Sequence, residues 1–196
     1  ELEGWQLAGS LAEQPLASLR VRHTIGLADP LTQKDVALHE RRDDGLPDTL
    51  LEHVEMYRLD AFKIKLCGVP AQDLERLTKI AGVLRNAGVR QALVTLDANE
   101  QYGELGSLLE LVHALERDST ARFLLDALAY FEQPLPRARA IHRSLESGLA
   151  ALTEYAPVII DESDAGQGAF ERAIACGYRG VSVKNCKGVF RALLHH

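Results

Sequence analysis

Charged side chains stand at the ends of several short apolar runs in this sequence. Lys63 and Lys65 alternate with an isoleucine at the end of one run, and three later runs each deliver one carboxylate, at Asp97, Glu132 and Asp161. Three carboxylates gathered in a partly dry pocket repel one another and take up protons unless a cation neutralises them. A hard divalent metal with oxygen ligands is the natural cation for such a set.

The residue types favour Mg²⁺ as that metal, with Mn²⁺ as the alternative. The set contains no His or Cys at ligand spacing, which argues against Zn²⁺. Three carboxylates also leave octahedral positions free for water or for substrate oxygens. Lys63 and Lys65, two residues apart on a strand, point to the same side of it. Because two inward ammonium groups are costly to bury, we expect them to serve the same site.

The spacing of these residues indicates repeated βα units. Intervals of 32, 35, 29 and 23 residues separate Lys65, Asp97, Glu132, Asp161 and Lys184, which is about one βα unit in each case. Catalytic groups collect at the carboxyl ends of the strands in a parallel α/β barrel, because the βα loops open there. The charged residues are therefore expected on successive strands of one barrel.

The elements that would position these residues alternate along the chain. Apolar runs predict strands at residues 19–27, 61–66, 91–96, 127–132, 157–161 and 180–184. Helical periodicity predicts helices at residues 48–59, 72–86, 105–125 with a break near 118–120, 137–155 and 169–176. Residues 27–47 are polar and predict a long loop. This alternation is typical of a parallel α/β sheet.

Composition excludes several classes of protein. The 196 residues are 46% hydrophobic and 26% charged, with a net charge of −6, so neither disorder nor a basic surface for nucleic acid is expected. No apolar run approaches the ~20 residues of a membrane span, and residues 1–10 lack the pattern of a signal peptide, so we expect no membrane contact and a cytoplasmic location. Three cysteines without CxxC spacing predict reduced, buried thiols.

The charged runs, taken in order, resemble the enolase superfamily, the family of mandelate racemase and muconate lactonizing enzyme. The resemblance is closest to the muconate-lactonizing subgroup. It rests on KIK at 63–65, DAN at 97–99, EQP at 132–134, DES at 161–163 and VKNCKG at 183–188. One departure is that the family has a Gly-Gly pair after the last lysines, where this chain has Gly188 followed by Val189.

The resemblance implies roles for individual residues. The family's metal ligands match Asp97, Glu132 and Asp161. Lys65 and Lys184 match the lysines that face each other across the substrate, while Lys63 would neutralise the substrate carboxylate or tune its neighbour. A lysine acts as a base near neutral pH only when burial, a metal or a second ammonium group lowers its pKa, and Lys63 beside Lys65 offers such a like charge.

Four further residues have both a functional and a structural interpretation. Asn99 and Gln133 could orient ligands, but they could equally satisfy loop backbone groups. Glu162 matches the family's acid beside the third ligand, and residues 161–163 could alternatively cap a helix. His23 could face the substrate, although a lone histidine is more often a hydrogen-bonded core or rim residue.

The resemblance implies a TIM (β/α) barrel, of which about six βα units are present. We expect residues 1–196 to form one partial catalytic domain, without the family's capping domain and last strands, and homo-oligomers of the full-length protein. The implied activity is Mg²⁺-dependent removal of the proton alpha to a substrate carboxylate, giving a racemase, an epimerase or a cycloisomerase. The alternatives are an acid-sugar dehydratase, a noncatalytic metal-binding barrel, and another metal-dependent barrel enzyme, for which no HxH ligand motif is found.

Overall fold

Six parallel strands form one sheet in the order in which they occur in the chain. The structure is a computed structural model that describes residues 6, 9, 13–42 and 44–194. The strands are β1 (His23–Ile25), β2 (Ala61–Lys65), β3 (Leu93–Asp97), β4 (Leu128–Glu132), β5 (Val158–Ile160) and β6 (Gly180–Val181). The predicted parallel α/β fold is confirmed. In the described part of the chain β1 and β6 do not pair with each other, so the barrel is partial.

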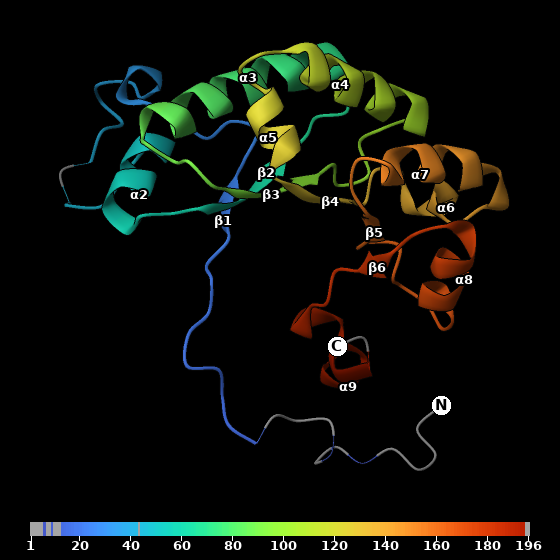
Figure 1. Cartoon of the computed structure of the whole chain (residues 1–196). Coiled ribbons are helices and arrows are strands. Elements are labelled where there is room, and N and C mark those ends of the chain that lie inside the picture. Colours follow the sequence, from blue (N-terminus) through green and yellow to red (C-terminus); the bar gives the residue numbers. More distant parts are fainter. Residues whose placement is uncertain (1–5, 7–8, 10–12, 43, 195–196) are drawn as a thin grey trace.

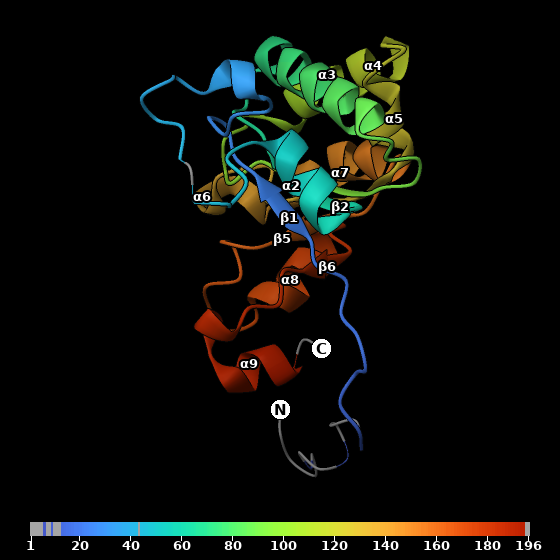
Figure 2. The same ribbon diagram turned by 90° about the vertical axis from the view of Figure 1, so that its left-hand side faces the viewer.

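Helices connect consecutive strands and lie along the outer side of the curved sheet (Figure 1). They are α2 (Leu50–Tyr57), α3 (Pro70–Asn86), α4 (Leu105–Arg117), α5 (Arg122–Asp126), α6 (Arg137–Ala140), α7 (Glu146–Thr153) and α8 (Ala169–Cys176), followed by α9 (Val189–Leu194). Figures 1 and 2 both place α8 and α9 far from α3, at the β6 end of the sheet. No helix in the described residues is long and apolar enough to span a membrane.

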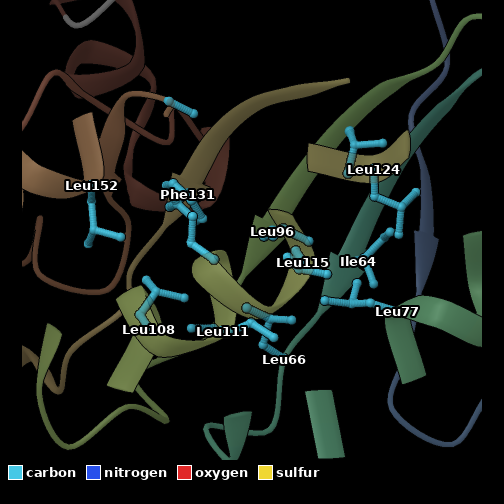
Figure 3. Packing of buried hydrophobic residues seen from close by; sticks show 14 of the residues in the cluster. Ile64, Leu66, Leu77, Leu96, Leu108, Leu111, Leu115, Leu124, Phe131 and Leu152 are labelled. Carbon is cyan, nitrogen blue, oxygen red and sulfur yellow. The ribbon is translucent and has the colours of Figure 1, made fainter. Parts of the chain in front are cut away.

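The hydrophobic core fills the space between the sheet and these helices (Figure 3). Ile64 and Leu96 project from β2 and β3 and are almost fully buried, as are Leu77 on α3 and Leu111 on α4. Because side chains alternate along a strand, the residues on either side of Ile64 point to the opposite, inner face of the sheet. Packing of Ile64 against the helices therefore fixes the direction of Lys63 and Lys65.

Two predicted helices are interrupted. The expected break near residues 118–120 separates α4 from α5, and Asp118 stabilises it by accepting hydrogen bonds from the backbone N–H groups of Thr120 (2.8 Å) and Ala121 (2.7 Å). The prediction of one continuous helix over residues 137–155 is wrong. There α6 is followed by the 3₁₀ turn η2 (Arg143–Leu145) and then by α7, and His142 Nδ1 accepts a hydrogen bond from Ser144 N at the start of η2.

Two other local predictions need correction, and one is confirmed. The first strand is shorter than the predicted residues 19–27, and Val21 and Leu27 on either side of β1 are 68% and 52% exposed. The predicted loop over residues 27–47 is confirmed in its described residues, which contain the short 3₁₀ turn η1 (Gln33–Asp35). All three cysteines are free as predicted, but only Cys176 is buried, whereas Cys67 is partly buried and Cys186 is exposed.

Candidate active site

Lys65, Asp97 and Glu132 stand in register on three neighbouring strands. Lys65 pairs with Asp97 across β2 and β3, and Asp97 pairs with Glu132 across β3 and β4. Each is the last residue of its strand. Side chains in register on parallel strands point to the same face, so the ends of β2, β3 and β4 bring one ammonium group and two carboxylates together on the inner face.

Lys63 bridges the two carboxylates of this row. Its Nζ lies 2.7 Å from Asp97 Oδ2 and 2.8 Å from Glu132 Oε2. Both carboxylate side chains are fully buried, and the Lys63 side chain is 11% exposed. The two ammonium groups of β2 share one oxygen, since Lys65 Nζ lies 2.6 Å from the same Asp97 Oδ2. The prediction that both lysines point inward is therefore met.

Asn99 connects this row to the end of β5. Its side-chain oxygen accepts a hydrogen bond from Lys65, and its Nδ2 donates to Glu162 Oε1 at 2.9 Å. Its backbone N–H donates to Asp97 Oδ1 at 3.0 Å. Asn99 therefore orients one lysine and two acids at once. Such bonds favour the functional interpretation of Asn99 over that of an isolated turn residue.

Asp161 follows the last residue of β5 and has two lysine partners. Lys184 donates a hydrogen bond to Asp161 Oδ2, and Lys187 Nζ lies 3.0 Å from Asp161 Oδ1. The Asp161 side chain is 3% exposed. The third predicted carboxylate is thus held by lysines from the segment after β6, on the opposite flank of the site from Lys63 and Lys65.

Gln133 is fully buried and joins the ends of β4 and β5. Its Oε1 accepts hydrogen bonds from the backbone N–H groups of Asp161 (2.8 Å) and Ser163 (3.1 Å). Its Nε2 donates to Ser163 Oγ at 2.6 Å and to Leu135 O at 2.7 Å. Gln133 therefore satisfies loop backbone groups, which was its structural interpretation, and by doing so it fixes the backbone that carries Asp161.

The backbone takes unusual conformations beside these residues. Asn99, Glu100 and Gln133 have φ angles of 44°, 70° and 40°, in the left-handed region that non-glycine residues rarely adopt. Non-glycine residues in this region cluster at functional sites, where the surrounding contacts hold them. All three lie immediately after β3 and β4, so the strain is confined to the carboxyl ends of the strands that carry Asp97 and Glu132.

The ion pairs keep two of the lysines charged. Burial is the largest single influence on the pKa of Lys63 and lowers it, but the hydrogen bonds and charges of Asp97 and Glu132 together outweigh it, so the pKa is raised. The pKa of Lys184 is likewise lowered by burial and raised to a greater extent by Asp161. As they are paired here, Lys63 and Lys184 are ammonium ions. At Lys184 the like charge of Lys63 also lowers the pKa, but the contacts with Asp161 outweigh it.

The same pairing acts on Asp161 in the opposite direction. Burial favours the protonated carboxyl group, but the hydrogen bonds from Lys184 and Lys187 favour the carboxylate more strongly, and the pKa of Asp161 is lowered. The repulsion expected among the three carboxylates is thus relieved by lysines. Asp161 has two lysine partners, whereas Asp97 and Glu132 share Lys63.

The carboxylate oxygens of Asp97, Glu132 and Asp161 are suitable ligands for a divalent cation, but here they form ion pairs with lysines. In the described residues no group of three or more Asp, Glu, His or Cys side chains is placed to hold a metal ion. The Lys63 ammonium group lies between Asp97 and Glu132 instead. Glu132 Oε1 is nevertheless buried without a hydrogen-bond partner. A buried carboxylate oxygen without a partner is costly, and a cation would satisfy it.

His23 lies away from this cluster. Its ring stands 4.6 Å from that of His53 on α2, measured between centroids, and His23 pairs in register with Phe62, which belongs to the core. The opposite face of β1 belongs to Thr24, which pairs with Lys63. Burial and the charge of His53 lower the pKa of His23. Packing against α2 therefore favours the structural interpretation of His23 over a substrate contact.

The site also contains two residues, Lys187 and Arg22, for which no role was predicted. Lys187 holds Asp161, and the spacing of two lysines three residues apart in VKNCKG was the only signal for it. Arg22 precedes β1 and donates hydrogen bonds to Thr95 Oγ1 at 3.3 Å and to the Tyr130 hydroxyl group. An arginine beside a short edge strand gives no sequence signal of such a contact.

Two muconate lactonizing enzymes and an enolase of the mandelate racemase subgroup are among the solved structures that share this fold. The muconate lactonizing enzyme from Pseudomonas putida is 22% identical, with a TM-score of 0.55 over 89% of this chain and 42% of its own. For the muconate lactonizing enzyme from Klebsiella pneumoniae the identity is 19% and the TM-score 0.56, over 90% and 41%. An enolase of the mandelate racemase subgroup from Agrobacterium tumefaciens is 16% identical, with a TM-score of 0.56 over 89% of this chain and 42% of its own.

These likenesses establish the fold. The chain spans about two fifths of the length of these proteins. No family model matches the sequence, and no curated protein matches it. The resemblance drawn from the five motifs is therefore confirmed at the level of the fold, as part of an open α/β barrel.

Proposed function

We propose that this chain forms part of the catalytic barrel of an enolase-superfamily enzyme that removes the proton alpha to a substrate carboxylate. The observation that carries the proposal is the row of charges at the carboxyl ends of β2 to β6. Lysines from β2 flank Asp97 and Glu132 on one side, and Lys184 flanks Asp161 on the other. A substrate bound over the carboxylates would meet an ammonium group from each direction.

Asp97, Glu132 and Asp161 would hold the divalent cation, Mg²⁺ or Mn²⁺. Such a cation would supply positive charge for the substrate carboxylate and for the negative charge that develops when the α-proton leaves. Three observations support this assignment: the carboxylates are buried, they lie at the carboxyl ends of three consecutive strands, and Glu132 Oε1 has no hydrogen-bond partner. Gln133 and Asn99 orient two of these acids.

The lysines would move the protons. An α-proton beside a carboxylate is a very weak acid, so its removal needs a base at close range and concentrated positive charge. Lys184 can accept the proton as a neutral amine once it is released from Asp161, which otherwise keeps it protonated. Lys65 can then return a proton to the α-carbon from the other side. The two transfers balance and invert the carbon, which favours a racemase or epimerase over the cycloisomerase and dehydratase alternatives.

Isotope exchange tests the proposal. The full-length protein is incubated with Mg²⁺ in D₂O against a library of acid sugars, dipeptides and N-acyl amino acids, and α-deuterium is measured by mass spectrometry. We expect exchange with one compound class and its loss in Lys65→Ala and in Lys184→Ala. Lys79→Ala is the matched control, because the Lys79 side chain is 61% exposed and pairs with Glu75 on the same helix, away from the site.

The same experiment can overturn the proposal. No exchange across the library, with Mn²⁺ binding intact by isothermal titration calorimetry, would favour a noncatalytic metal-binding barrel. The ion pairs between the site carboxylates and the lysines support this alternative function, because they neutralise the buried charges without any reaction.

A further inference from the structure

The ammonium group of Lys187 is saturated with oxygen acceptors. Its Nζ donates to Asp161 O at 2.9 Å and to Ser182 O at 3.0 Å, and it lies 3.0 Å from Asp161 Oδ1. A lysine ammonium group has three N–H donors, so these three oxygens use its full capacity. The side chain is only 15% exposed. Lys187 is therefore fixed in place and has no free donor for a substrate.

These contacts close a short loop of chain around Lys184. The ladder between β5 and β6 ends with the bond from Ser182 N to Ile160 O at 2.8 Å, two residues before Lys184. Beyond it the chain enters the 3₁₀ turn η3 (Asn185–Lys187), in which Lys187 N donates to Lys184 O at 3.1 Å. The Lys187 side chain then returns to Ser182 O. Residues 182–187 thus form a ring, closed by an ammonium group, with Lys184 within it.

A second contact anchors the same segment on its C-terminal side. Arg191 on α9 donates to Asp164 O at 2.7 Å, and Asp164 Oδ2 lies 3.5 Å from Lys187 Nζ. Both basic side chains therefore attach the chain after β6 to the chain after β5. The exposed side chains of Val189 and Phe190, at 64% and 68%, contribute little burial to hold this segment. Polar contacts centred on Lys187 are what position it.

We propose that Lys187 is a positioning residue that holds the backbone of Lys184 against the end of β5. The inference rests on the proposed function of Lys184 in proton transfer. Lys184 lies past the last ladder bond, and its side chain is 37% exposed, so the sheet and the core do not fix it. Displacement of a catalytic group by about 1 Å can cost ~10²-fold in rate. The clamp formed by Lys187 prevents such a displacement.

Two substitutions separate positioning from charge. Lys187→Met keeps the length of the side chain and removes the charge and all three donors. Lys187→Arg keeps the charge, but a planar guanidinium group cannot place its donors on the same three oxygens. Lys79→Met is the control for loss of a surface lysine. Thermal unfolding of each variant shows whether the fold is retained, and Lys187→Arg serves as the test if Lys187→Met does not fold.

The first readout needs no substrate. Cys186 lies in the turn and its thiol is exposed, while Cys176 is buried, so a nitroxide can be attached to Cys186 in a Cys67→Ser background. We expect its electron paramagnetic resonance lines to narrow in Lys187→Met and in Lys187→Arg and to stay unchanged in Lys79→Met. Unchanged lines in both Lys187 variants would overturn the inference, whatever reaction the protein catalyses.

The second readout separates positioning of Lys184 from a general structural role. Exchange of the α-proton is followed separately for the two enantiomers of the N-acyl amino acid or dipeptide that exchanges in the library. One enantiomer carries the α-proton that Lys184 removes, and it is identified as the one whose exchange is lost in Lys184→Ala. For this enantiomer we expect Lys187→Met to lower kcat by about 10²-fold, with KM little changed. Equal loss for both enantiomers would overturn the inference, because the ammonium group would then act through Asp161. Absence of exchange in the unsubstituted protein would contradict the proposed function, and the spin-label result would still stand.

Discussion

The ammonium nitrogen of Lys63 lies 2.8 Å from Glu132 Oε2, across the strand that separates β2 from β4. It reaches Asp97 on that intervening strand as well, at 2.7 Å. The inner face of the sheet therefore carries an ion network in which one lysine serves two buried carboxylates. Because both acids are fully buried, this contact governs the stability of the site as well as its chemistry.

Loss of the Lys63 charge should destabilise the fold strongly. Lys63→Met leaves Asp97 and Glu132 buried with one cation fewer, and removal of one partner of a buried ion pair costs about 3–5 kcal/mol. Urea denaturation in EDTA at pH 7 measures the free energy of unfolding. Lys79→Met, in an exposed pair with Glu75, should cost no more than about 0.5 kcal/mol. Equal effects of the two variants would contradict the buried network.

Divalent cations should stabilise the Lys63→Met variant more than the unsubstituted protein. In the variant the carboxylates of Asp97 and Glu132 no longer hold the Lys63 ammonium group, so a cation has one competitor fewer. A ligand that binds only the folded state stabilises it by about 2.7 kcal/mol at 100 times its Kd. Thermal unfolding with and without Mn²⁺ measures the difference. The increase in unfolding temperature caused by Mn²⁺ should disappear in the double variant Lys63→Met/Glu132→Gln. An increase that persists there would mean that the cation binds at another site.

The carboxylate of Asp118 should make stability depend on pH in the acid range. Backbone hydrogen bonds from Ala121 and Thr120 lower its pKa in the folded state. Its contribution is therefore fully present above the unfolded pKa of ~3.9 and is lost as the pH falls through the lower folded value. Asparagine keeps an acceptor oxygen but not the charge that strengthens these hydrogen bonds, so we expect Asp118→Asn to cost about 1 kcal/mol at pH 7. The cost should shrink as the pH falls towards 2. Asp126→Asn, in an exposed pair with Arg122, should show little effect at pH 7. A cost for Asp118→Asn that stayed constant from pH 7 to pH 2 would contradict the assignment.

The break at Asp118 illustrates what a sequence encodes locally. An acidic residue followed by Ser119 and Thr120 accepts backbone hydrogen bonds within three residues, so the interruption is specified by its own neighbours. The same holds for Lys63 and Lys65, whose common direction follows from alternation along β2 and from the burial of Ile64. Order and direction of the strands follow from such local rules, and these were the correct predictions.

Contacts between distant segments were not predictable in this way. The phase of alternation in the short strand β1 decides whether His23 or Thr24 faces inward, and it is set by the register with β2 and by the packing of His23 against His53. The cap at His142 interrupts a segment with helical periodicity. The residues next to Lys187 in the sequence suggest a solvent-exposed side chain. Its three oxygen acceptors instead come from the ends of β5 and β6. Pairing of the carboxylates with lysines likewise depends on side chains that reach across several strands.

Two glycines should respond in opposite ways to a methyl group. Gly68 follows β2 with a φ of 84°, and a Cβ there would lie 2.4 Å from the backbone oxygen of Gln101, so Gly68→Ala forces apart the loops after β2 and β3. Gly82 lies inside α3 with open space around it. Alanine at a compatible helical position stabilises by about 0.5–1 kcal/mol, whereas alanine at an incompatible one destabilises by more.

The consequences for the site follow from where Gly68 lies. Its N–H donates to Asp73, which Tyr102 also holds at 2.7 Å, and Lys65 precedes this loop on β2. We expect Gly68→Ala to lower both the free energy of unfolding and any exchange that depends on Lys65, while Gly82→Ala raises stability and leaves exchange unchanged. Urea denaturation and the D₂O assay measure the two effects. A Gly68→Ala variant as stable as the Gly82→Ala variant would mean that the loops after β2 and β3 can separate freely, and the close approach that aligns Lys65 with Asp97 would then have no structural role.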